Sequence, residues 1–89
     1  MKEWHVYILE CADHSLYTGI TTDTIRRLHE HNHDDRLAAS YTRNRRPVKL
    51  VYQEQYQDRS SALCREAEIK GMRRQDKLRL CGMPGCRGS

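Results

Sequence analysis

Two short runs rich in β-branched and aromatic residues, 5–12 and 16–22, flank a polar cluster at 13–15. This pattern predicts a β-hairpin with residues 13–15 as its loop. Opposed residues then share a face, so that Ile8 lies opposite Ile20. One face is apolar, and the other carries Tyr7, Leu9, Cys11, Tyr17, Gly19 and Thr21. A two-residue loop would separate Tyr7 from Tyr17 and mix the apolar residues, so we favour the first register.

The remaining segments predict two longer helices, one more strand and a short last helix. A helix over 23–32 carries a buried stripe of Ile25, Leu28 and Asn32, and an irregular segment covers 33–46. A strand follows at 48–56. Asp58 caps a helix over 59–70 that Gly71 ends. A last helix spans 73–81, with Lys77 and Arg79 pointing outward.

These elements predict one domain of the α/β (α+β) class over residues 1–81. Its core is a three-stranded, mainly antiparallel sheet flanked by about three helices. Residues 82–89 show no pattern and predict a flexible C-terminal tail.

The helix over 59–70 has a carboxylate on its apolar stripe. Glu66 stands three or four positions from Ala62, Leu63 and Ile69, which form that stripe. A charge on a buried stripe needs a partner or a metal ion. The sequence leaves both open: a metal ligand, or a salt bridge to an arginine such as Arg27.

Arg27 and His31 are i, i+4 neighbours on the first helix, beside its apolar stripe. The two side chains can reach one ligand together at the edge of the buried face. Without the tyrosines of the hairpin, the simpler interpretation is a surface arginine next to a histidine.

Charge is unevenly distributed along the 89 residues, whose net charge is +4. Residues 1–34 have a balance of −3 and residues 35–89 a balance of +7. The densest positive cluster is Arg43, Arg45 and Arg46, just after Tyr41. A basic second half suits a polyanion, and we expect this cluster to bind nucleic-acid phosphates, although a solvated loop has the same composition.

The N-terminus does not resemble a signal peptide, and no apolar run reaches the length of a membrane span. We therefore expect a cytoplasmic protein whose four cysteines are reduced thiols. No obligate protein partner is evident.

The residues singled out above resemble those of the GIY-YIG nuclease superfamily. Val6-Tyr7 followed by Tyr17-Thr18-Gly19 is similar to its paired motif, with Thr18 where the motif has isoleucine and His5 where it has glycine. Arg27, His31, Tyr41-Thr42 and Glu66 follow in the order and spacing of the small stand-alone members, over roughly residues 4–80. A late asparagine found in many family nucleases has no counterpart after Asn44.

This resemblance implies a metal-dependent endonuclease that hydrolyses phosphodiester bonds in DNA, or in RNA, with a preference for structure over sequence. Glu66 is then the ligand of Mg²⁺ or Mn²⁺, and Tyr7 the general base. Arg27 stabilises the transition state, while Tyr17 and His31 orient water or phosphate. Gly19 leaves the surface open to close approach.

Two alternatives remain open at this stage. The first keeps the fold as a nucleic-acid-binding module with a weak or inactive site, which the missing asparagine favours. The second is a zinc site built from His29, His33, Cys81 and Cys86, whose spacing fits no strong template.

Overall fold

The structure is a computed structural model that describes residues 3–82. The predicted flexible tail, apart from Gly82, lies outside these described residues, and so does Cys86. No helix within the described part is long and apolar enough to cross a membrane.

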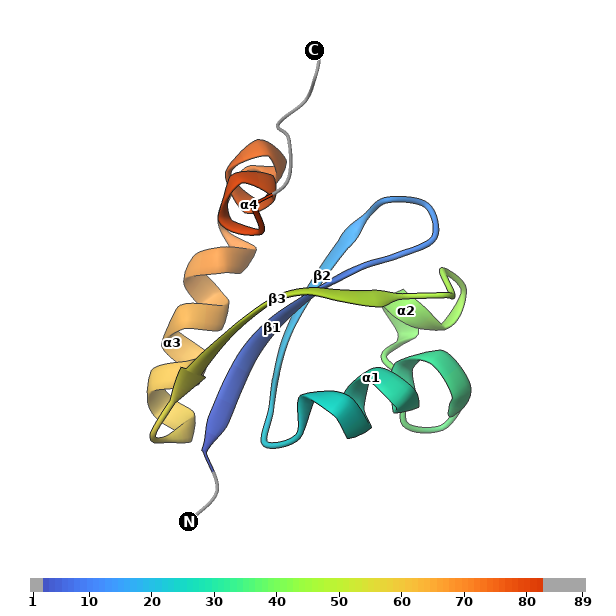
Figure 1. The fold of residues 1–89 in the computed structure, drawn as a ribbon, viewed down its shortest axis with the longest axis horizontal. Helices are drawn as coiled ribbons and strands as arrows, with labels where there is room; N and C mark the ends of the chain where they lie inside the picture. Colours follow the sequence, from blue (N-terminus) through green and yellow to red (C-terminus); the bar gives the residue numbers. More distant parts are fainter. Residues whose placement is uncertain (1–2, 83–89) are drawn as a thin grey trace.

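A single antiparallel sheet organises the chain (Figure 1). Its strands are β1 (Trp4–Glu10), β2 (Leu16–Thr21) and β3 (Lys49–Tyr56), in the order β2-β1-β3. Four helices flank it: α1 (Thr24–His33), α2 (Ser40–Arg43), α3 (Arg59–Lys70) and α4 (Arg74–Leu80). The predicted fold class is confirmed. The short α2 lies in the stretch expected to be irregular.

The predicted hairpin register is wrong by two residues. Tyr7 lies opposite Gly19, Val6 opposite Ile20 and Ile8 opposite Thr18, so Ile8 does not face Ile20. The strands end at Glu10 and Leu16, which leaves a five-residue connection where three were expected. Within it, Cys11 N–H donates to the carbonyl of Ser15, and His14 adopts a left-handed conformation with φ of 67°. A shift of two keeps every side chain on its predicted face.

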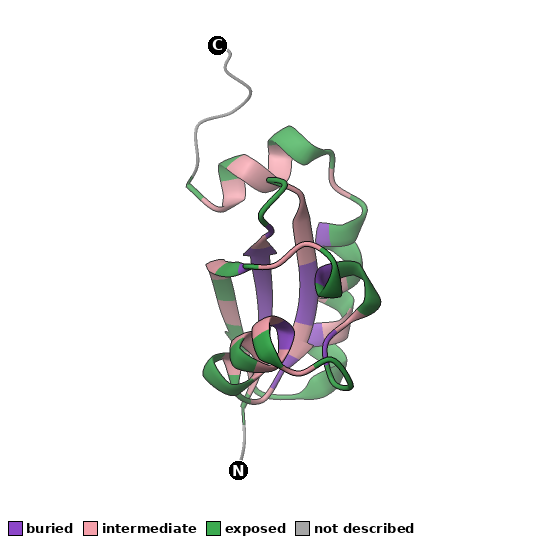
Figure 2. Cartoon of the chain, turned by 90° about the vertical axis from the view of Figure 1, so that its right-hand side faces the viewer, coloured by how far each residue is buried: buried purple, intermediate pink, exposed green. Residues whose placement is uncertain are grey.

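One face of the sheet packs on α3, on the left of Figure 1. Val6 and Ile8 from β1 meet Ala62 and Ile69 from α3, and all four are fully buried. The side chains of Met72, Leu80 and Cys81 extend this core toward α4. In Figure 2 the purple of buried residues is concentrated on the central strands, with green helix surfaces outside.

The other face carries a second core beneath α1. Tyr7, Leu9, Cys11 and Val48 are buried there, with Leu28 of α1 packed against them. Asn32 fixes the start of β3 because its side-chain amide exchanges two hydrogen bonds with the backbone of Val48, at 2.7 and 2.9 Å. The apolar stripe that the sequence predicted for α1 is wrong at Ile25, the first of its three residues.

Ile25 is 82% exposed, since it lies in the first turn of α1, where the helix has not yet reached the sheet.

A polar cluster ties β3 to α3 on the α3 face. The Glu54 carboxylate accepts hydrogen bonds from the hydroxyls of Tyr52 and Tyr56, and Nε and Nη2 of Arg65 donate to it as well. Arg65 also pairs with Glu68 at 3.1 Å. The Arg65 guanidinium and the two phenols hold the pKa of Glu54 below its usual range, although burial opposes them. The charges of this cluster are matched within the fold.

Candidate active site

The phenol of Tyr7 crosses the neighbouring strand at Gly19. Tyr7 is 2% exposed, and a Cβ atom added at Gly19 would lie 2.6 Å from its hydroxyl oxygen and 2.8 Å from its Cζ. Any larger residue at position 19 would therefore occupy the space of the phenol. The sequence predicted that Gly19 admits a close approach, and the atoms that make this approach within the fold are those of Tyr7.

Tyr7 begins a buried series of hydrogen bonds that leads into α1 and α2. Its hydroxyl lies 3.0 Å from Nε2 of His31, whose Nδ1 lies 2.9 Å from Oγ1 of Thr42. The Thr42 hydroxyl in turn donates to the carbonyl of Ala39 at 3.0 Å. His31 and Thr42 are both completely buried. The structure therefore places His31 against Tyr7, as the sequence predicted for one shared site.

These bonds fix the tautomer of His31. A threonine hydroxyl has a single proton, and the proton of Thr42 goes to Ala39. The bond between Thr42 and Nδ1 must then come from an Nδ1–H donor. Neutral His31 consequently carries its lone pair on Nε2, where it accepts the proton of the Tyr7 hydroxyl.

Both members of this pair are held in their neutral forms. Burial raises the pKa of Tyr7 to about 12, although the neighbouring Arg27 guanidinium opposes the shift. Burial lowers the pKa of His31 to about 4, and the positive charges of Arg27 and Arg46 add to this, while Glu30 opposes them. At pH 7 a phenol with that pKa is ionised in roughly one molecule in 10⁵. Tyr7 must therefore transfer its own proton to another group when it takes one from water.

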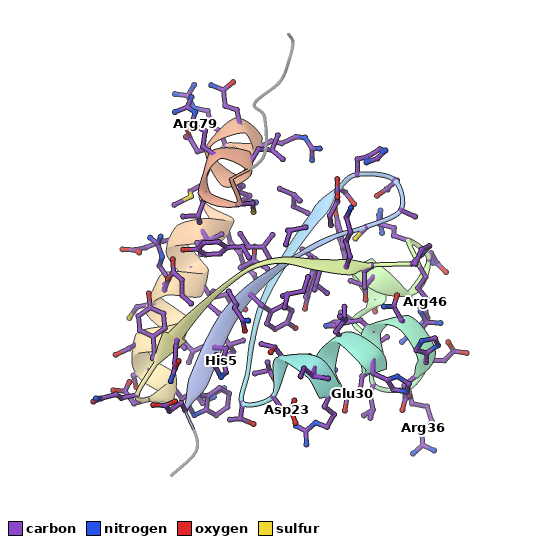
Figure 3. All side chains as sticks on the ribbon, in the orientation of Figure 1. His5, Asp23, Glu30, Arg36, Arg46 and Arg79 are labelled. Atoms are coloured by element: carbon purple, nitrogen blue, oxygen red, sulfur yellow. The ribbon has the colours of Figure 1, made fainter. Side chains whose placement is uncertain are left out.

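Arg27 lies at the open side of the phenol and is held from α1. Its Nη1 donates to Glu30 at 2.9 Å and to the carbonyl of Leu37 at 2.7 Å. These two bonds use Nη1 alone, and the guanidinium also interacts with the hydroxyl of Tyr7, so its remaining donors are shared between that hydroxyl and a ligand. Figure 3 shows Glu30 and Arg46 on the same α1 side of the molecule.

Tyr17 and Tyr41 extend the site outward as a series of rings. Tyr17 lies edge-on to His31 with a centroid distance of 5.3 Å, and Tyr41 stacks on Tyr17 at 5.9 Å. The guanidinium of Arg45 lies 4.2 Å above the Tyr41 ring. The rings run from the buried phenol to the surface, where Tyr41 is 39% exposed.

Glu66 lies on α3, and its negative charge is the smallest of the contributions that raise the pKa of Tyr7. Its carboxylate pairs with Lys70, one turn along the helix, at 3.4 Å, and its side chain is 18% exposed. The salt bridge to Arg27 that the sequence left open is not formed, because Arg27 pairs with Glu30.

The three arginines after Tyr41 take up different structural roles. Arg45 pairs with Asp13 at 3.2 Å, and Arg46 pairs with Asp35 at 2.8 Å and donates to the carbonyl of His31. Arg43 is exposed and has no carboxylate partner among residues 3–82. Of the expected phosphate contacts, Arg43 is therefore the one that the fold leaves most available.

Of the side chains considered for zinc, the three in the described part of the chain do not gather. The rings of His29 and His33 lie 4.6 Å apart on α1 and are tilted, while Cys81 packs into the core on the opposite face of the sheet. Cys11, Cys64 and Cys81 are all free thiols.

Thr42 is the member of the site whose function the sequence did not reveal. It lies in a segment without periodicity, so no pattern indicated that its hydroxyl would be buried. The only signal was its position directly after Tyr41, a residue already singled out.

The chain is similar to known proteins over most of its length. Residues 3–79 match the family described as the GIY-YIG catalytic domain. A UPF0213 protein of Haloquadratum walsbyi is 53% identical over 81 residues, which cover 90% of this chain and 89% of that protein. A UPF0213 protein of Staphylococcus aureus is 52% identical over 90% of this chain and 95% of its own length.

Two structures solved by solution NMR are also similar. A UPF0213 protein of Bacillus halodurans superposes with a TM-score of 0.57 at 39% identity, covering 94% of this chain and 87% of that one. A protein of E. faecalis gives a TM-score of 0.61 at 41% identity, covering 89% and 82%. The family match covers most of the chain, and the chain belongs to the GIY-YIG family.

Proposed function

We propose that this chain is a divalent-metal-dependent endonuclease that hydrolyses phosphodiester bonds in DNA, with a preference for structure over sequence. The observation that carries the proposal is the buried series from Tyr7 through His31 to Thr42, with Arg27 and Glu66 beside it. Hydrolysis of a phosphodiester needs a base for the attacking water and positive charge for the phosphate. The site offers groups for both tasks.

The donor set fits Mg²⁺ or Mn²⁺. Glu66 brings one carboxylate, and the described residues contain no cluster of three or more ligating side chains around it. Mg²⁺ suits such a site, since it keeps several waters and is held through one or two carboxylates plus substrate phosphate oxygens. Binding would require Glu66 to leave Lys70, an exposed pairing that costs little to break. The cation, when bound, neutralises phosphate charge and acidifies water.

Tyr7 and His31 form a path for the proton of the attacking water. Tyr7 accepts that proton on its hydroxyl oxygen while its own proton passes to Nε2 of His31, 3.0 Å away. This transfer avoids a free phenolate, which a pKa of about 12 disfavours, but the imidazolium that it forms is also disfavoured at neutral pH, because burial lowers the pKa of His31 to about 4. A substrate phosphate close to His31 favours the imidazolium that results, because opposite charges within a few ångströms stabilise each other.

Arg27 and the exposed cations contact the phosphates. Arg27 contacts the scissile phosphate through its remaining donors, and Tyr17 orients that phosphate by its hydroxyl. Tyr41 and Gly19 line the approach. Arg43, with Arg45 and Arg46 behind it, contacts the backbone outside the site.

A cleavage panel tests the proposal. Single-stranded, duplex, flapped and branched DNA, with matched RNAs, are incubated with the protein in Mg²⁺, Mn²⁺ or EDTA. A Tyr7→Phe preparation made in parallel controls for contaminating nucleases. We expect metal-dependent cutting, fastest on flapped or branched DNA. Binding without cutting under any metal would instead support the inactive binding module.

A further inference from the structure

A hollow of about 200 Å³ lies at the outer end of the series of rings and plays no part in the chemistry above. Ser15 and Leu16, where β2 begins, form one side of it, and Tyr41 of α2 forms another. Arg74 and Lys77 of α4 close it. Three segments far apart in the sequence therefore meet around this space.

The hollow is continuous with the candidate active site. Its wall, Tyr41, stacks on Tyr17 at 5.9 Å, and Tyr17 lies 5.3 Å from the ring of His31. A nucleic-acid strand whose scissile phosphate lies against Tyr7 and Arg27 thus passes over Tyr17 and Tyr41 and reaches the hollow.

The two α4 side chains bring positive charge without compensation. Neither Arg74 nor Lys77 has a carboxylate partner within residues 3–82, whereas the acidic groups nearby are already paired. Asp13 pairs with Arg45, and Asp76 pairs with Arg79. Arg74 donates Nη2 to the carbonyl of His14 at 2.7 Å, which positions its guanidinium beside the hairpin. The sequence predicted that Lys77 points outward, and Lys77 lines this hollow at the surface.

We infer that this hollow binds a phosphate of a single nucleic-acid strand that leaves the active site toward α4. The inference rests on the proposed function and extends it to a second contact on the substrate. Two unpaired cations around a small polar space select an anion. Tyr17 and Arg45 already pack on the ring of Tyr41, so the hollow takes backbone and not a stacked base.

The path to the hollow indicates one strand. About 200 Å³ accommodates a phosphate and its sugar, and the rings of Tyr17 and Tyr41 form a single line from the active site to this space. The preferred substrate therefore has a single-stranded arm next to the cut, and α4 holds that arm. This assigns a structural cause to the preference for flapped DNA.

The test measures DNA affinity in EDTA, so that binding is read without cleavage. The double variant Arg74→Gln/Lys77→Gln is compared with Lys49→Gln/Arg79→Gln, which removes the same charge from cations that are already paired. Figure 3 shows Arg79 on α4, away from the hairpin. Dissociation constants for a flapped DNA and a blunt duplex are measured over a range of salt concentrations.

For the hollow variant we expect at least tenfold weaker binding of flapped DNA at low salt. The slope of log affinity against log salt should fall by about 1.4, since each lost single-strand contact removes about 0.7. The control should change less than twofold. The single variant Lys77→Gln breaks no side-chain hydrogen bond or ion pair among residues 3–82. It should give half of the slope change even if the Arg74 substitution loosens the hairpin.

Equal affinities and slopes for the hollow variant and the control would overturn the inference. An equal loss on flapped DNA and on the blunt duplex would overturn the assignment to a single strand. Cleavage is measured separately in Mg²⁺, so a wild-type protein that binds flapped DNA through the hollow but does not cut it would contradict the proposed function alone.

Discussion

The two faces of the sheet each carry a polar cluster built on tyrosines, half-buried on the α3 face and fully buried on the α1 face. The two clusters differ in how their charges are matched. On the α3 face the Glu54 carboxylate takes hydrogen bonds from Tyr52, Tyr56 and Arg65, so its charge is matched within the fold. On the α1 face Tyr7 and His31 are neutral and Arg27 pairs with Glu30, while Glu66, whose charge acts on Tyr7 from α3, pairs with Lys70.

This difference distinguishes a structural cluster from a reactive one. A carboxylate that accepts four donors has little capacity left for a ligand. The Tyr7 phenol has a proton acceptor on one side and arginine donors on the other, so this cluster can still bind a substrate. The number of tyrosines alone would not have shown which face carries the structural cluster and which the reactive one.

Replacing one tyrosine by phenylalanine on each face should affect different properties, cleavage on the α1 face and stability on the α3 face. The loss of cleavage is the largest effect we expect. Tyr7→Phe removes the hydroxyl that receives the proton of water, so metal-dependent cleavage should fall by roughly 10²–10⁴-fold. Tyr56→Phe removes one of the donors to Glu54 and should lower stability by about 1 kcal/mol while leaving cleavage unchanged. Single-turnover cleavage and thermal melting of both variants measure this. Equal cleavage by Tyr7→Phe and the parent would remove Tyr7 from the mechanism.

His31 should make the α1 face sensitive to acid. Its pKa is about 4 in the folded protein and about 6.5 when unfolded, so folding favours the neutral form. The stability from this difference is present above pH 6.5 and is lost as the pH falls toward 4. Over that range it amounts to about 3 kcal/mol.

Thermal melting between pH 7 and pH 4.5 measures the acid effect. His31→Gln should lose much less stability than the parent over this interval, whereas His29→Gln, on the exposed side of α1, should follow the parent. Identical pH dependence in the parent and His31→Gln would contradict the buried neutral histidine.

Gly19→Ala should displace the phenol of Tyr7 with little change elsewhere. The added methyl would lie 2.6 Å from the Tyr7 hydroxyl oxygen, so the ring must move. We expect a stability loss of about 1–3 kcal/mol and a cleavage loss of roughly tenfold to hundredfold. Gly71→Ala meets its nearest atoms at 3.6 Å and serves as the control. A Gly19→Ala protein with full activity would show that the phenol need not lie across β2.

Thr42→Val tests the fixed tautomer of His31 and should have the smallest effect. The valine keeps the shape but removes the acceptor for Nδ1–H, which allows the other tautomer. We expect roughly a tenfold loss of cleavage, and ¹⁵N chemical shifts of His31 that move away from the Nδ1–H form. Thr42→Ser should restore both. Unchanged ¹⁵N shifts in Thr42→Val would mean that Thr42 does not set the tautomer.

The sequence predicted which residues share a face but not how the strands are aligned. Hydrophobic alternation has a period of two, so a register shifted by two residues sorts the same side chains to the same faces. Pairing Ile8 with Ile20 or with Thr18 was therefore indistinguishable from the pattern. The alternation correctly placed Tyr7 and Tyr17 together because that property survives the shift.

The sequence predicted the bounds of α3 well, but it did not predict which side chains pair with residues from other segments. Asp58 and the bounds of α3 were correct because caps and periodicity are local signals. Arg45 and Arg46 were assigned from charge alone, which contains no information about Asp13 or Asp35, and no pattern indicated the hollow beside α4. Contacts between segments far apart in the chain decided the role of each.

The central claim is that Glu66 completes the reactive cluster by holding a divalent cation. Its most direct test compares Glu66→Gln with Glu68→Gln, a carboxylate on the same helix that pairs with Arg65 and is 66% exposed. Cleavage of flapped DNA is measured at a series of Mg²⁺ concentrations, with melting temperatures as a check on folding. We predict that Glu66→Gln folds, binds DNA and cuts roughly 10²–10³-fold more slowly, while Glu68→Gln cuts within about twofold of the parent. A folded Glu66→Gln protein that cuts at the parent's rate with the same Mg²⁺ dependence would contradict the account.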